Sequence, residues 1–215
     1  MKIDILCSSA DHPVNEYLKR WIFEHERDHD ISLCREKADL RGGDILFLIH
    51  CTEMIDKNTR DRFCRSLVTH ASDLPKGRGW SPHIWQVLEG KQEIRVSLLE
   101  AEDAVDSGAI WHQNKLVIPQ SALWDEVNEA LFDTELKLMN FALTAIKDIQ
   151  PEPQNAEGSI TYYRKRTPAD SKLDPNLSIR SQFDLMRICD PDRFPAYFEL
   201  HGQNYKIRLE KMSDD

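Results

Sequence analysis

A chain of 215 residues with 40% hydrophobic content is long enough to bury one core and carry one small appendage. Its charged fraction of 30% lies near the globular average, which excludes disorder, collagen and coiled coil. The net charge of −9 argues against a nucleic-acid partner, because phosphate contacts require a concentrated excess of Lys and Arg.

Export and membrane insertion are not expected for this chain. The N-terminal apolar run is short and contains an acid, and nowhere do about 18 apolar residues follow one another. The five cysteines are an odd number without a C-x-x-C pair, which disfavours a disulfide framework and a zinc ribbon. These features predict a reduced, cytoplasmic protein with no membrane partner.

The first half of the chain alternates strand and helix patterns. Residues 3–7 predict a buried strand, and residues 15–25 an amphipathic helix. Residues 45–49 are continuously apolar, as is typical of a central parallel strand covered on both faces. A crossover helix over 56–66 and a further strand over 67–70 are expected to follow.

The next elements complete one α/β domain. A Ser-Pro start and a closing Gly predict a short helix over 81–90. Strands are expected over 94–99 and 116–118, and a 3.6-residue period predicts a long helix over 121–146. We therefore expect an α/β fold, with an open, mostly parallel, Rossmann-like sheet and helices on both faces.

The composition changes at the Pro-rich stretch 150–154, where the long helix must end. Short strand-like pieces follow, including a β-hairpin with strands over 196–200 and 205–209. We predict a catalytic domain over 1–149 and a small C-terminal β-rich subdomain over 150–215.

The most informative segment is residues 70–82. His70 is expected to end a buried strand and to open into a Pro/Gly-rich loop, at the carboxyl edge where open α/β sheets place their ligands. Histidine changes charge near neutral pH, and a nearby carboxylate favours its charged form. This segment therefore predicts acid–base chemistry.

The segment resembles the folate-dependent formyltransferases, a family that includes methionyl-tRNA formyltransferase, glycinamide ribonucleotide transformylase and the sugar N-formyltransferases. The family patterns H-x-S-x-L-P-x-x-R-G-x-x-P and D-x-G-x-I are matched here by His70, Ser72, Leu74, Pro75, Arg78, Gly79 and Pro82, and by Asp106, Gly108 and Ile110. The resemblance implies a catalytic pair, in which His70 donates to the oxyanion and Asp106 orients it and accepts protons from the attacking amine.

The resemblance also implies the binding residues. N10-formyltetrahydrofolate, as formyl donor, would contact the chain, largely through backbone groups, at His50, Cys51, Thr52, Met54, Asp103 and Val105. The acceptor would contact Ser72, Lys76, Arg78, Gly79, Trp80, Arg164 and Arg166. The residues alone explain Lys76, Arg78 and the basic cluster 162–166 equally well as solvated charges. No catalytic metal is expected, because the histidines lack ligand spacing.

One position departs from the family. The family usually has Asn two residues before the His, and this chain has Val68 there. Residues two apart on a strand face the same side, so Val68 should point toward the site and Thr69 away from it. Loss of one oxyanion donor costs on the order of 100 to 1,000-fold in rate. The chain is therefore slow, is compensated by backbone amides of 70–74, or works differently.

Residues 76–86 look most like formyltransferases of pseudaminic-acid-type pathways, which act on nucleotide-linked amino sugars. This implies a UDP-4-amino-4,6-dideoxy sugar as acceptor, with Arg and Lys on its diphosphate. A homodimer is one option for the assembly. Two alternatives stay open: a catalytically impaired module that binds folate or a sugar nucleotide, and a formyltetrahydrofolate hydrolase.

Overall fold

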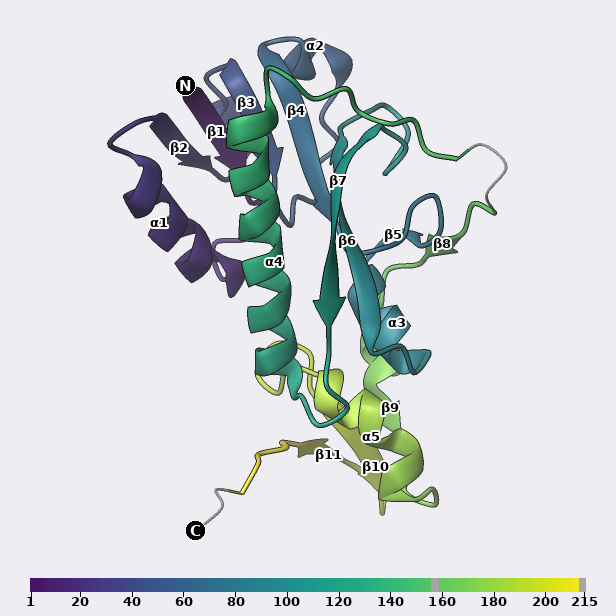
Figure 1. The fold of residues 1–215 in the computed structure, drawn as a ribbon. Coiled ribbons are helices and arrows are strands. Elements are labelled where there is room, and N and C mark those ends of the chain that lie inside the picture. The colour runs from purple at the N-terminus through teal and green to yellow at the C-terminus, as the bar shows by residue number, and fades with distance from the viewer. Residues whose placement is uncertain (156–158, 213–215) are drawn as a thin grey trace.

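The computed structural model describes residues 1–155 and 159–212, and its centre is a six-stranded sheet (Figure 1). In spatial order the strands are β2 (Asp30–Cys34), β1 (Lys2–Leu6), β3 (Gly43–Leu48), β4 (Phe63–His70), β6 (Glu93–Glu100) and β7 (Ile110–Val117). Strand β6 alone runs opposite to the other five strands of this sheet, since it pairs antiparallel with both β4 and β7. The open, mostly parallel α/β sheet is therefore confirmed.

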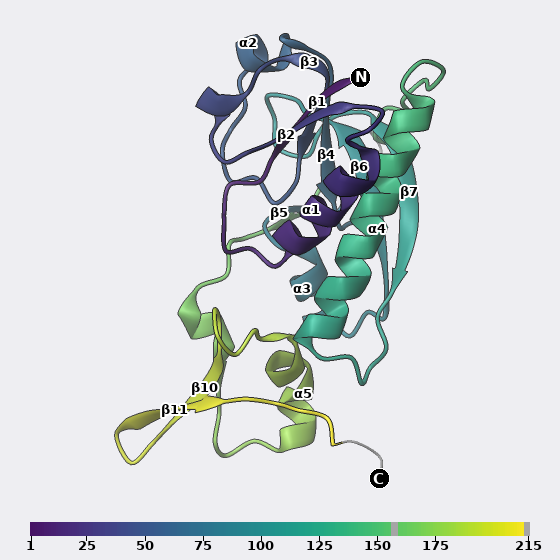
Figure 2. The ribbon, with the colours of Figure 1, turned by 90° about the vertical axis from the view of Figure 1, so that its left-hand side faces the viewer.

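The two long helices lie side by side on one face of the sheet (Figures 1 and 2). They are α1 (Val14–His25) and α4 (Trp124–Ala145), and α3 (Pro82–Leu88) joins the same apolar cluster. In the described part of the chain, the helices on the opposite face are short: η1 (Lys37–Asp39) and α2 (Lys57–Arg60). Helices thus cover both faces, but unequally.

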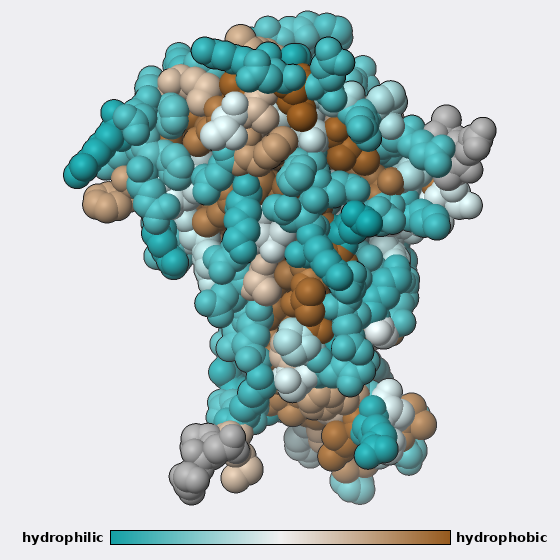
Figure 3. Space-filling view, in the orientation of Figure 1, coloured by the Kyte–Doolittle hydropathy of each residue, from teal (hydrophilic) through white to brown (hydrophobic). Residues whose placement is uncertain are grey.

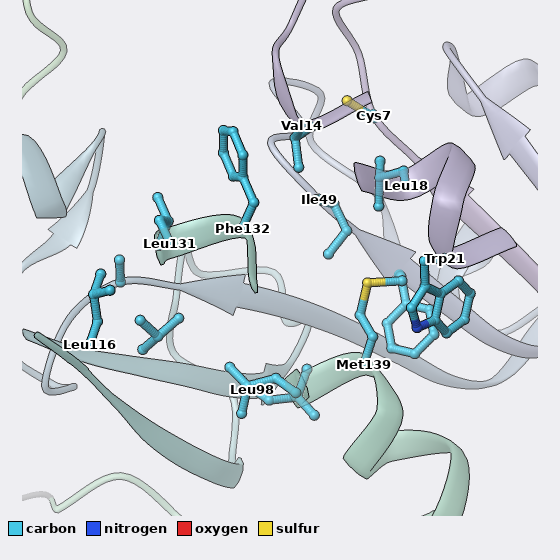
Figure 4. Close-up of a cluster of buried hydrophobic side chains, with 14 of the residues drawn as sticks. Cys7, Val14, Leu18, Trp21, Ile49, Leu98, Leu116, Leu131, Phe132 and Met139 are labelled. Carbon is cyan, nitrogen blue, oxygen red and sulfur yellow. The ribbon is translucent and has the colours of Figure 1, made fainter. Parts of the chain in front are cut away.

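Side-chain alternation along the strands explains why both faces are buried. Ile3 and Ile5 of β1 join the cluster under α1 and α4, whereas Leu6 joins a second cluster on the other face. Figure 4 shows Trp21 of α1 and Met139 of α4 in the first cluster. Full burial of an apolar side chain stabilises the fold by about 1.5–3 kcal/mol.

Two expectations about this domain were wrong, and one strand was not predicted. The helix expected over 56–66 is only α2, because Phe63 packs into the second cluster as the first residue of β4. Strand β2 was not expected, and β7 is much longer than the predicted 116–118. In β7 polar residues alternate irregularly with buried Trp111 and Leu116, which hides the strand pattern.

The C-terminal unit has a small sheet and a core of its own. It contains β8 (Tyr162–Tyr163), η2 (Pro168–Ser171), β9 (Lys172–Leu173), α5 (Ile179–Ile188), β10 (Ala196–Leu200) and β11 (Gln203–Ile207). Strands β9, β10 and β11 pair into one sheet, which packs with α5 around buried Met186. The small β-rich subdomain is confirmed, whereas α5 was not expected and the domain boundary at 149/150 stays a prediction.

The hairpin is tighter than predicted, because β11 begins at Gln203 rather than at residue 205. Its turn is the two residues His201 and Gly202, both with positive φ (52° and 74°), as a two-residue hairpin turn requires. A separate two-residue strand, β5 (Arg78–Gly79), pairs with β8. This pairing fastens the C-terminal chain to the segment 70–82.

Candidate active site

His70 is the last residue of β4, and its side chain is only 7% exposed. Its Nε2 donates to the backbone oxygen of Gly77 at 2.8 Å. Its Nδ1 lies 3.5 Å from Oδ1 of Asp106, in the loop between β6 and β7. The structure therefore brings together the two side chains that the sequence predicted as a pair.

Asp106 is held in an unusual backbone conformation. Its φ is +52°, a left-handed value that non-glycine residues adopt uncommonly. Its Oδ2 accepts a hydrogen bond from the backbone N–H of Gly79 at 2.8 Å. The predicted acceptor contact Gly79 thus holds the carboxylate through its backbone.

Gln154, which the sequence marked only as part of the break after the long helix, anchors the Asp106 loop. Its Nε2 donates to the backbone oxygens of Asp106 and Gly108, at 2.7 and 3.0 Å. Its Oε1 accepts from Nη2 of Arg78 at 2.6 Å. Arg78 is buried and contacts the loop through Gln154, and its Nε has no hydrogen-bond partner among the described residues.

We expect Gln154→Ala to lower kcat by about 10-fold, because a small displacement of a catalytic group has a large effect on rate. Gln154→Glu should lower kcat similarly, since a carboxylate still accepts from Arg78 but cannot donate to two carbonyls. Gln150→Ala, which changes an exposed Gln of the same linker, is the matched control. Unchanged kcat in both Gln154 variants would contradict the anchoring role.

A cavity of about 510 Å³ lies beside the same loop. Its lining includes Pro75, Arg78, Asp103, Gly108, Gln154 and Ile160. Asp103, one of the predicted folate contacts, is also paired with Nη2 of Arg60 at 2.7 Å. The cavity therefore borders the Asp106 loop, but neither His70 nor Asp106 is among the residues that line it.

The remaining predicted folate contacts are His50, Cys51, Thr52, Met54 and Val105. Val68 and Cys51 pack against the second cluster, as expected for a residue on the His70 face of β4. Thr52 donates its N–H to Oγ of Ser8, and Met54 and Val105 are exposed. His50 differs from the others, because its Nε2 lies 3.1 Å from Oε2 of Glu135 on α4.

The predicted acceptor contacts fall into two groups. Lys76 and Trp80 are exposed at the motif loop, and Nζ of Lys165 lies 4.7 Å from the centre of the Trp80 ring. Ser72 is buried, and its Oγ has no partner among the described residues.

The two arginines expected on a diphosphate already have protein partners. Arg164 forms an ion pair with Asp170, which holds the pKa of that carboxyl far below its usual range. Nη2 of Arg166 donates to the backbone oxygen of Asp170 at 2.9 Å and to Oγ of Ser171 at 3.2 Å. Binding a diphosphate would therefore have to rearrange or share these contacts.

Three further imidazoles, those of His12, His50 and His83, lie near one another, and the sequence analysis did not predict this group. The ring of His12 stacks on that of His50, with centroids 4.1 Å apart. Burial and the nearby His50 lower the pKa of His12 to about 2. Burial, with His50 and His70 nearby, lowers the pKa of His83 to about 3.

These lowered pKa values predict acid sensitivity. In the unfolded chain these histidines take up protons below about pH 6.5, whereas in the folded protein His12 and His83 stay neutral. Protonation therefore favours the unfolded chain, and the free energy of unfolding decreases as the pH falls below about 6.5. The loss is about 2 kcal/mol per imidazole at pH 5. His12→Asn should flatten the fall of Tm between pH 7 and 5, whereas His201→Asn on the exposed hairpin turn should not. Parallel Tm profiles for both variants would refute the assignment.

Among residues 1–155 and 159–212, no group of three or more His, Cys, Asp and Glu could hold a metal ion. No helix in this described part of the chain is long and apolar enough to cross a membrane.

An α/β sheet with a buried imidazole and a carboxylate meeting beside its central strand defines a site suited to acid–base catalysis of group transfer. The profile of the family described as Formyl transferase matches residues 4–143, and the chain belongs to this family. The methionyl-tRNA formyltransferase of Lactococcus lactis subsp. lactis (strain IL1403) is 30% identical over 150 residues, 68% of this chain and 46% of that protein. The chain thus spans about half the length of this curated relative.

Solved structures share the fold. Methionyl-tRNA formyltransferase from Clostridium thermocellum has a TM-score of 0.81 at 21% identity, covering 99% of this chain and 94% of that chain. A sugar N-formyltransferase from Shewanella sp FDAARGOS_354 has a TM-score of 0.73 at 16% identity, covering 100% and 99%. HypX from Aquifex aeolicus in complex with tetrahydrofolic acid has a TM-score of 0.76 at 19% identity, covering 95% and 36%. At these identities the likeness shows the fold alone.

Proposed function

We propose that the chain transfers a formyl group from N10-formyltetrahydrofolate to the amine of a nucleotide-linked amino sugar, of the UDP-4-amino-4,6-dideoxy type. The observation that carries the proposal is the His70–Asp106 pair, 3.5 Å apart within the sequence motif of a formyl transferase family. HypX, a structural neighbour, was solved with tetrahydrofolic acid, and sugar N-formyltransferases are among the full-length structural neighbours.

The residues around Val68 suit a flat folate ring. Val68 and Cys51 are half-buried apolar side chains on the His70 face, and Met54 and Val105 are large apolar side chains that are exposed. Such a mixture of apolar wall and backbone polar groups is typical of small-molecule sites. When bound there, the folate supplies the activated formyl group.

The pair has the geometry for the transfer. A separation of 3.5 Å is long for a hydrogen bond, so the N–H at Nδ1 of His70 is left to donate to an oxyanion that develops beside Asp106. Asp106 orients the ring and stabilises its positive charge. Nε2 of His70 remains fixed on Gly77 throughout, which keeps the ring in place.

The assay combines N10-formyltetrahydrofolate with a panel of UDP amino sugars and with methionyl-tRNA, and follows tetrahydrofolate release and product mass. Release only with an amino sugar supports the proposal. Formylation of methionyl-tRNA would reject the amino sugar and identify the tRNA as the acceptor. Release without amine indicates a hydrolase, and folate binding without turnover indicates a binding module.

Val68→Asn should raise kcat by at least about 10-fold, since it returns an amide donor to the face of β4 that carries His70. Val68→Ile, which keeps a β-branched apolar side chain and adds no hydrogen-bond donor, is the control and should not reproduce the gain. Steady-state kinetics with the amino sugar measures both variants. Equal rates for wild type and Val68→Asn would mean that the protein supplies the missing donor elsewhere.

The proposed assembly is a homodimer formed through the C-terminal unit. Large apolar side chains are exposed there, at Leu177, Ile179, Phe194, Leu200, Tyr205 and Met212. Figure 3 shows apolar surface gathered over this unit, at the bottom of the view. Exposed apolar patches of this kind commonly mark interfaces. Light scattering should return twice the chain mass of 25.0 kDa, and a monomer at micromolar concentration would contradict the assembly.

A further inference from the structure

Strand β5 and the residues beside it contact a different part of the protein along each edge. The N–H and C=O groups of a strand point alternately to its two sides, so groups two residues apart point the same way. On one side, the backbone oxygen of Gly77 accepts a hydrogen bond from Nε2 of His70 at 2.8 Å. On the same side, the N–H of Gly79 donates to Oδ2 of Asp106 at 2.8 Å. The catalytic pair, His70 and Asp106, thus occupies the edge where a further strand would otherwise pair.

The C-terminal unit holds the other edge, where β8 lies beside β5 (Figure 1). The N–H of Arg78 donates to the backbone oxygen of Thr161 at 2.9 Å. The N–H of Trp80 donates to the backbone oxygen of Tyr163 at 3.0 Å. Gly79 permits this close approach, because a Cβ at its position would lie 2.4 Å from the oxygen of Tyr163. Strand β5 therefore lies between the C-terminal unit and the catalytic pair.

Thr161, the residue before β8, binds two successive N–H groups of this segment. Its backbone oxygen accepts from Arg78, and its Oγ1 accepts from the N–H of Gly77 at 2.8 Å. The peptide unit between Gly77 and Arg78 is therefore bound at both ends, since its C=O accepts from His70 and its N–H donates to Thr161. Hydrogen bonds that are joined through one peptide unit polarise and strengthen one another. The contact with Thr161 thus supports the hydrogen bond that holds the imidazole.

Each member of the catalytic pair has its own support from the chain that follows α4. Gln154 holds the Asp106 loop through two backbone oxygens. Thr161 supports the other member, because the position of the Gly77 oxygen sets the tilt of the His70 ring. Nδ1 of His70 lies 3.5 Å from Oδ1 of Asp106, so a tilt of the ring changes this distance directly. A displacement of about 1 Å at a catalytic group costs on the order of 100-fold in rate.

We propose that Thr161 is a positioning residue for formyl transfer, which holds the ring of His70 through the peptide unit between Gly77 and Arg78. The proposal rests on the proposed catalytic role of His70 but not on which amine accepts the formyl group. A Thr161 that only fastens the C-terminal unit would affect the stability of the fold and nothing else. A positioning Thr161 also affects the turnover of the folded chain and the hydrogen bond of His70.

The first test needs no substrate. In ligand-free protein labelled with 15N-histidine, at pH 7.5, the proton on Nε2 of His70 should give a slowly exchanging signal, assigned by its absence in His70→Gln. Thr161→Val should shift this signal upfield and speed its exchange, because the hydrogen bond to Gly77 becomes weaker. Thr161→Ser should retain the wild-type signal. A wild-type His70 without a proton on Nε2 would overturn the proposal.

The second test is kinetic and uses the full chain with N10-formyltetrahydrofolate and the acceptor that the panel identifies. Thr161→Val keeps the β-branched shape and removes Oγ1 as an acceptor, so kcat should fall by about 10-fold. KM for both substrates should stay within about 2-fold of wild type, because the substitution acts through His70 and removes no substrate contact. Thr161→Ser keeps the hydroxyl, so its kcat should return to within about 3-fold of wild type.

Thr144→Val is the matched control, since it makes the same substitution at an exposed position of α4, where Oγ1 donates to the backbone oxygen of Phe141. This variant should have the kcat and the His70 signal of the wild type. Wild-type kcat or an unchanged His70 signal in Thr161→Val would overturn the proposal. If no amine is formylated, the proposed function is rejected, and the His70 signals of the two Thr161 variants then decide the positioning role alone.

Discussion

Replacing His70 by Ala is expected to lower kcat by about 1,000-fold or more, while the affinity for folate changes by less than about 3-fold. The imidazole is buried between Gly77 and Asp106, so its loss removes the donor to the oxyanion. The folate contacts expected around Cys51, Thr52 and Val105 lie on other segments and keep their positions. Single-turnover release of tetrahydrofolate measures the first effect, and titration with tetrahydrofolate measures the second.

Two further variants separate chemistry from folding. His70→Gln retains a polar side chain that can bond to Gly77 but cannot carry the charge of an imidazolium, and it should be nearly as slow as His70→Ala. His112→Ala removes an exposed histidine of β7 and should behave as wild type. Full activity in His70→Ala would remove His70 from the mechanism.

The proximity of His70 and Asp106 was predictable because strand patterns and motif spacing locate both residues along the sheet. The run 45–49 and the strand ending at His70 are apolar enough to be central strands, and the motif spacing fixes the loop that follows. The 36-residue step to Asp106 then matches a family whose members share this fold. Strong apolar patterning and fixed spacing carry long-range information that single residues do not.

The role of Gln154 was not predictable, since it depends on contacts that leave no local pattern. Its partners Asp106 and Gly108 lie more than 40 positions earlier in the chain, and β5 meets β8 through only two residues each. The same holds for His50, whose direction is set by a single left-handed φ. Arg164 was expected to be available for an anion, but the η2 turn brings Asp170 back onto it.

Asp106→Asn is expected to lower kcat by about 100 to 1,000-fold with little loss of stability. Asn tolerates left-handed backbone conformations, and its amide oxygen can still accept from the N–H of Gly79. The loop should therefore keep its place, held also by Gln154. The variant loses only the negative charge that stabilises the imidazolium of His70. A lower rate in this variant would therefore be caused by the lost charge and not by a changed geometry.

Glu102→Gln is the matched control on the same loop, because Glu102 is exposed and is not one of the predicted folate or acceptor contacts. Its kcat should remain within about 3-fold of wild type, since a substitution on the exposed surface has little effect. Tetrahydrofolate release and Tm, measured for both variants, distinguish a lost charge from a lost fold. Wild-type turnover in Asp106→Asn would mean that His70 acts without its carboxylate.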